Sequence, residues 1–153
     1  MALASDIVGA IIGDLSVLGG VCKPGQAMMP PAIGGSRRYT FALPTIVETP
    51  RASGVYGQPT IIDGAFRWAF TKSALDQSQD VPQNDVPADL SIFDTGADLR
   101  RIFLSDCATR KKAISLTLGL VAHDWPAAGN AQQMLGGEFT INVSYYDDTT
   151  GVR

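Results

Sequence analysis

Charged residues are scarce in this chain. Only 18% of its 153 residues are Asp, Glu, Lys or Arg, whereas 45% are hydrophobic. Typical soluble domains contain roughly 25% charged residues, so a lone monomer of this composition has less surface charge than usual. Either a large core lies beneath a neutral polar surface, or part of an apolar surface is covered in an oligomer or by a partner. The second explanation is favoured, because the amino-terminal segment described below indicates the same.

Basic residues are few as well. The chain has 12 Lys and Arg residues and a net charge of −3, whereas a broad nucleic-acid-binding surface needs clustered positive charge. Nucleic acid is therefore not an expected partner. No apolar run reaches the ~18 residues that a transmembrane helix needs, so no membrane partner is expected either. Residues 1–21 contain no Lys or Arg and are interrupted by Asp6 and Asp14, which is unlike a signal peptide. We expect a protein made in the cytoplasm.

Residues suited to catalysis or metal binding are sparse. Cys22 and Cys107 lie far apart and neither has a Cys-x-x-Cys partner, so no disulfide framework or zinc site is expected. The single histidine, His123, is followed by Asp124, but consecutive strand residues point to opposite faces of a sheet. The nucleophile elbow and the phosphate-binding loop are both missing from the sequence. The sequence therefore predicts a protein that is not an enzyme and needs no cofactor.

An acidic region is followed directly by a basic one. Residues 73–99 contain no Lys or Arg, and the candidate acidic partner patch within them consists of Asp76, Asp80, Asp85 and Asp89. Their spacing matches no EF-hand, so a solvated loop is favoured over a calcium site. The candidate basic contacts that follow are Arg100, Arg101, Lys111 and Lys112. The two regions either pair between subunits or are exposed charges near helix ends.

The amino-terminal segment is apolar and rich in glycine. Residues 1–22 are interpreted as an apolar arm and residues 23–36, which contain several prolines and glycines, as a linker. A short helix capped by Ser5 or Asp6 is one alternative, and an extended arm is the other. Such a segment packs either in the domain's own core or on a neighbouring subunit. The expected anchors are Ile7, Ile11, Leu15 and Leu18.

The remaining residues, 37–153, are expected to form a single mainly β domain. Hydrophobic residues alternate with polar ones in 38–43, 66–70, 113–121 and 138–146, which is the pattern of a sheet with one buried face. Residues 60–71 are expected to form another strand, or a hairpin around Asp63 and Gly64. One short helix, about 97–109, follows the acidic region, and Thr95 and Asp98 have the spacing of a capping box. Six or seven short strands and one helix favour an antiparallel β-sandwich or a barrel-like body.

These features favour a non-catalytic structural protein. We expect a bacteriophage or virus virion component, such as a capsid, decoration or tail subunit, assembled in the host cytoplasm. It would form a homo-oligomer or bind other particle subunits through the arm and the charged patches. The alternative is a lectin-like or pilin-like β-sandwich that binds carbohydrate or a surface, with the Asp-rich loop and Trp68, Trp125 or Tyr146 holding a sugar.

Overall fold

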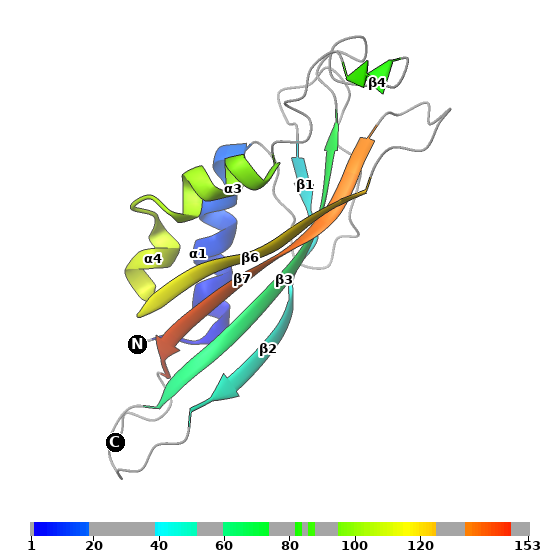
Figure 1. Cartoon of the computed structure of the whole chain (residues 1–153). Coiled ribbons are helices and arrows are strands. Elements are labelled where there is room, and N and C mark those ends of the chain that lie inside the picture. The colour runs from blue at the N-terminus through cyan, green and yellow to red at the C-terminus, as the bar shows by residue number, and fades with distance from the viewer. Residues whose placement is uncertain are drawn as a thin grey trace.

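The computed structural model describes residues 2–18, 39–51, 60–73, 82–83, 86–87, 95–124 and 134–147. They form a mainly β structure, in which helices cover one face of an antiparallel sheet (Figure 1). The strands of this sheet are β1 (Tyr39–Phe41), β2 (Thr45–Pro50), β3 (Ile61–Ser73), β6 (Ser115–Asp124) and β7 (Met134–Tyr146). A separate short ladder joins β4 (Pro82–Gln83) to β5 (Val86–Pro87).

The sheet is open. Its strand order is β1-β3-β7-β6, and β2 also pairs with β3. Because β1 pairs with the last part of β3 and β2 with its first part, β1 and β2 lie end to end along one edge. The opposite edge is β6. Within the described residues the sheet does not close on itself, so the mainly β class holds, whereas the expected sandwich or barrel is not confirmed.

The core lies between the sheet and the helices. Alternate residues of the two central strands are buried, as their sequence pattern predicts, and paired residues share a face, for example Trp68 with Phe139 and Phe66 with Ile141. The other buried residues on this face are Tyr39, Phe41, Ile62, Phe70, Leu116, Val143 and Tyr145. Trp68 stacks on Phe139, with ring centroids 6.3 Å apart. Complete burial of one such side chain contributes about 1.5–3 kcal/mol, so these pairs account for much of the stability of the sheet.

Of the two alternatives at Asp63 and Gly64, the structure has the strand and not the hairpin, because both residues lie inside the continuous strand β3. Gly64 is needed there for space. It is paired with Glu48 on β2, and a Cβ atom at this position would lie 2.8 Å from the Phe66 ring and 3.1 Å from the Tyr145 ring. The missing side chain lets the Tyr145 ring lie over β3, where its hydroxyl donates a hydrogen bond to the Glu48 carboxylate.

The amino-terminal segment forms a helix on the chain's own sheet. Helix α1 (Ala4–Leu15) is followed by the 3-10 turn η1 (Ser16–Leu18). Leu3 is the N-cap residue of α1, in place of the expected Ser5 or Asp6, and its backbone N–H donates to the Asp6 carboxylate at 2.8 Å. Among the residues that the structure describes, no helix is long and apolar enough to cross a membrane.

The single helix expected over 97–109 is two helices. Helix α3 (Thr95–Phe103) ends before a turn, and α4 (Ala108–Lys112) begins after it. The second helix starts where it does because Asp14 of α1 caps it: the carboxylate accepts hydrogen bonds from the Ala108 N–H at 3.1 Å and from the Thr109 N–H at 2.9 Å. It also accepts one from the Thr109 hydroxyl at 2.6 Å. A cap that comes from a distant helix satisfies amide groups that would otherwise lack partners.

Candidate assembly surface

The outer strand β6 contains a β-bulge. Leu118 is paired with Ile141, and Val121 with Phe139, so Gly119 and Leu120 together lie opposite Thr140. The bulge interrupts the alternation that the sequence suggests for Leu116, Leu118 and Leu120. Leu116 is buried and Leu118 partly buried, whereas 93% of Leu120 is exposed. Leucine at this exposure leaves a large apolar side chain in water at the edge of the sheet.

A groove of about 570 Å³ runs between this strand and α3. The strand contributes residues 116–121, and the helix side contributes Gly96, Ala97, Arg100 and Leu104. Two of these are the smallest residue types, which leaves room beside the strand. Leu104 is 54% exposed, so the groove has an apolar wall open to solvent.

The edge of β6 has few of the features that usually prevent edge pairing. Among the described strands, β7 alone pairs with β6, so one side of β6 presents backbone groups without a strand partner. Residues 115–122 contain no charged side chain and no proline. The other edge, β2, contains Glu48 and Pro50, and charge and proline are typical devices against edge-to-edge association. Within β6 such devices are the bulge and the charge of its last residue, Asp124.

The expected arm anchors lie in the chain's own core. Ile7 and Ile11 are 0% exposed and Leu15 is 1% exposed, and Leu18 packs against the same core from η1. Of the two arrangements considered for this segment, the structure has the one in which it packs on its own domain. The physical reason is that Ile7, Ile11 and Leu15 are spaced along one face of a helix and meet the aromatic face of the sheet.

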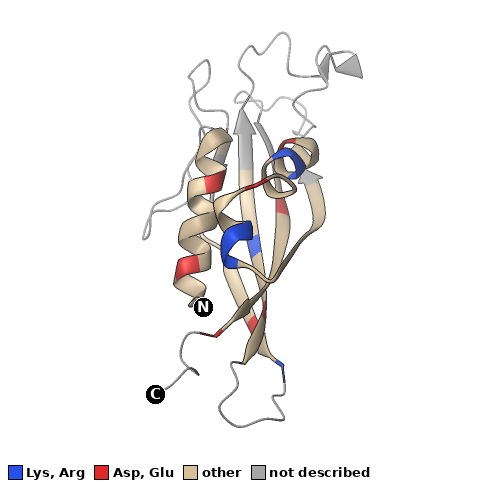
Figure 2. Cartoon of the chain, turned by 90° about the vertical axis from the view of Figure 1, so that its left-hand side faces the viewer, with Lys and Arg blue, Asp and Glu red and all other residues tan. Residues whose placement is uncertain are grey.

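The four basic residues lie on the two short helices. Arg100 and Arg101 are in the last turn of α3, and Lys111 and Lys112 in the last turn of α4, where positive charge is favourable to the helix dipole. Figure 2 shows basic residues on both helices and acidic residues on α1 beside them. All four are exposed. Arg100 lines the groove, and Arg101 forms an ion pair with Asp98 at 3.0 Å.

The candidate acidic partner patch, Asp76, Asp80, Asp85 and Asp89, lies outside the described residues. In the described part of the chain, no group of three or more His, Cys, Asp or Glu residues is arranged to hold a metal ion. Trp68, one of the aromatic residues expected to hold a sugar, is fully buried. His123 belongs to β6, as the sequence pattern predicts.

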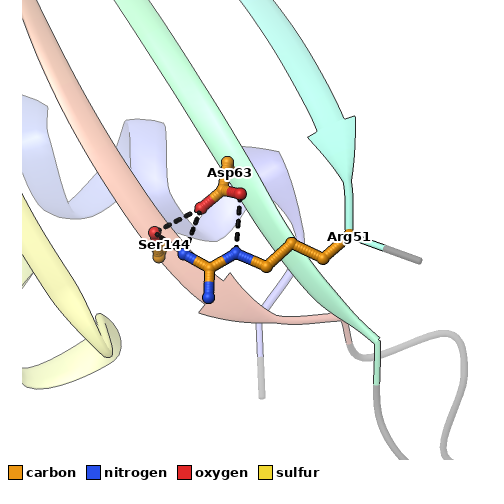
Figure 3. A network of polar contacts seen from close by, with 3 residues as sticks. All are labelled: Arg51, Asp63 and Ser144. Carbon is orange, nitrogen blue, oxygen red and sulfur yellow. Dashed lines mark hydrogen bonds and ion pairs between the residues drawn. The ribbon is translucent and has the colours of Figure 1, made fainter. Parts of the chain in front are cut away.

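Polar residues on the face of the sheet opposite the described helices form a network near the start of β3 (Figure 3). Arg51 donates two hydrogen bonds to the Asp63 carboxylate, at 2.8 and 2.9 Å, and the Ser144 hydroxyl donates a third. The bonds from Arg51 and then from Ser144 lower the pKa of Asp63 below its usual value. The carboxylate therefore stays charged at neutral pH and links β3 to β7 and to the residue that follows β2.

Cys107 is buried beside the cap of α4. Burial, together with the nearby Asp14 carboxylate, raises the pKa of its thiol. A raised pKa keeps the thiol protonated, and a protonated thiol is a poor nucleophile. The residue therefore acts as a small apolar side chain in the core.

The feature that sequence reasoning missed is the bulge with Leu120. The one signal for it was Gly119, because an isolated glycine within a strand pattern is typical of a bulge. No family model matches the chain, and neither does any curated protein sequence.

Proposed function

We propose that this protein is a non-catalytic structural subunit that assembles with copies of itself, as a bacteriophage or virus virion component. One observation carries the proposal: the outer edge of β6, which is uncharged over residues 115–122, with Leu120 93% exposed next to an apolar-walled groove. A subunit that stays monomeric gains nothing from such an edge, which promotes association unless it is covered.

The low charge of the chain supports the same proposal. With 18% charged residues, the surface contains little like-charge repulsion to oppose association of identical copies. Assemblies of identical copies reuse the same contacts many times, and a subunit with two distinct contact surfaces can form a shell, ring or tube. The exposed basic residues of α3 and α4 are the proposed charged contacts beside the edge. The buried anchors of α1 take no part, because the subunit's own core uses them.

The test is the behaviour of the purified chain at rising concentration. Light scattering and negative-stain microscopy should show rings, tubes or shells of defined size. A chain that stays monomeric across the whole concentration range contradicts the proposal. The carbohydrate-binding alternative loses one of its expected aromatic contacts, because Trp68 is buried.

A further inference from the structure

Resting on the proposed function, we infer that the partner of the β6 edge is the same edge of a second copy, paired antiparallel about a two-fold axis. Strand addition at a free edge satisfies the outward backbone N–H and C=O groups of both strands at once. A two-fold contact requires a surface that is complementary to itself. Three features of β6 meet that requirement.

The first feature is charge. Two exposed lysines, Lys111 and Lys112, precede the strand, and Asp124 is its last residue. Antiparallel pairing places the acidic end of one strand beside the start of the other strand, near the two lysines at the end of α4. A two-fold pair contains this arrangement twice. Parallel pairing would place like charges together. Between these ends, residues 115–122 have no charge that could repel its copy.

The second feature is the position of the bulge. The middle of β6, Ser115–Asp124, falls at Gly119 and Leu120. The pairing that joins the most residues therefore has its two-fold axis beside Leu120. Leu120 of one copy meets Leu120 of the other copy there. Burial of both removes from water the most exposed large apolar side chains of the described residues.

The third feature is the groove. A second strand laid along β6 would lie beside α3, over the small residues Gly96 and Ala97. Leu118 and Val121 are only partly buried in a single copy. In the pair, Leu118 and Val121 of the partner would lie on the core-facing side of the added strand and fill the groove. The pairing would extend the sheet across the axis and leave the helix layers of the two copies on the same side.

The decisive experiment uses opposite charges at one position. Leu120→Lys and Leu120→Glu are each prepared in the full chain, with Val17→Lys and Val17→Glu as matched controls at a residue that is 78% exposed on η1. Light scattering measures association of each variant alone and of the two Leu120 variants mixed in equal amounts. Circular dichroism checks that each variant folds.

Each Leu120 variant alone should associate at least about tenfold more weakly than wild type, because identical charges face each other at the axis. Mixing them should restore association, because Lys then faces Glu. The Val17 variants should behave as wild type does. Restoration by mixing is specific to a two-fold contact in which residue 120 faces itself.

Two results would overturn the inference while leaving the proposed function intact. If wild type assembles and both Leu120 variants assemble equally well, the interface lies elsewhere. If both variants are weakened and their mixture is not restored, the edge meets a different surface. A wild-type chain that never associates removes the proposed function and this inference together.

Discussion

A single carboxylate, that of Asp14, joins two helices that are 94 residues apart in the sequence. It accepts three hydrogen bonds at the start of α4, where Ala108 and Thr109 provide the donors. Helix α4 has five residues, too few to be stable without tertiary contacts. Its position therefore depends on this cap and on the burial of Thr109.

Replacement of Asp14 by alanine tests that dependence. We expect Asp14→Ala to lower the free energy of unfolding by about 1–2 kcal/mol, because the amide groups of α4 lose their acceptor. Urea denaturation measures the change. Asp106→Ala is the matched control, since Asp106 is an exposed carboxylate two residues before α4. Equal effects of the two substitutions would show that the cap contributes nothing of its own.

The hydroxyl of Tyr145 gives the molecule a response to alkaline pH. Burial, followed by the hydrogen bond to Glu48, raises the pKa of this tyrosine above its ordinary value of 10.0. Above about pH 10 the unfolded chain loses this proton and the folded chain keeps it. The contribution is therefore complete below the ordinary pKa and is lost as the pH rises above it.

We therefore expect the stability difference between wild type and Tyr145→Phe to shrink with rising pH. Near neutral pH the substitution should cost about 1 kcal/mol, because a buried hydrogen bond is lost. Between about pH 9 and about pH 11, wild type should lose more stability than the variant. Tyr146→Phe, at a residue 44% exposed, is the control. Identical pH profiles for wild type and Tyr145→Phe would contradict the assigned role of the hydroxyl.

At the scale of elements, glycine has opposite roles in the sheet and in the first helix. In β7, a side chain at Gly137 would collide with the Ala122 carbonyl oxygen and the Phe70 ring. In α1, a Cβ atom at Gly9 would meet nothing within 4 Å. The same substitution should therefore have opposite signs at these two positions.

Gly137→Ala should lower the free energy of unfolding by about 1–3 kcal/mol, because neighbouring strands must move apart. Gly9→Ala should raise the free energy of unfolding by about 1 kcal/mol, because alanine has a higher helix propensity than glycine and its methyl group meets no neighbouring atom. Thermal and urea denaturation of both variants check the pair. A neutral Gly137→Ala would mean that β6 and β7 are less closely packed than the structure has them.

The sequence predicted the parts of the sheet where local pattern and tertiary packing agree. Alternation identified the buried faces of β3 and β7 because every second residue from Phe66 to Phe70, and from Phe139 to Tyr145, meets the helices. At Gly64 a strand and a hairpin both remained open, because a glycine after aspartate favours a turn. In the structure this glycine makes space for the Tyr145 ring of the adjacent strand β7. The prediction of one helix over 97–109 failed because the break before α4 depends on Asp14, a partner that local pattern cannot identify.

The candidate site was harder to predict for a similar reason. The leucines of β6 form a perfect alternating series in the sequence, and one extra residue in the bulge moves Leu120 from the expected core to the surface. The apolar residues of the amino-terminal segment were interpreted as assembly anchors, with the chain's own core as the alternative. Composition shows that apolar surface exists but not which residues expose it. Tertiary packing decides which apolar residues enter the chain's own core and which stay exposed for assembly.

For the whole molecule, this arrangement separates the residues that fold the chain from those that we propose assemble it. Helix α1 supplies Ile7, Ile11 and Leu15 to the core. The loss of each such side chain costs about 2–5 kcal/mol, and the total stability of a domain is about 5–15 kcal/mol. The three side chains of helix α1 together therefore contribute a free energy comparable to the total stability of the domain.

We accordingly expect deletion of residues 1–18 to abolish cooperative folding, and not merely association. Thermal melting by circular dichroism should show no sharp transition, because the aromatic face of the sheet would be exposed to water. Leu120→Lys is the contrasting variant: it should still melt cooperatively and fail only to associate, since residue 120 is 93% exposed. If the truncated chain instead melts cooperatively and stays monomeric, α1 contributes little to its own domain. The segment would then act as the arm on a neighbouring copy that its composition first suggested.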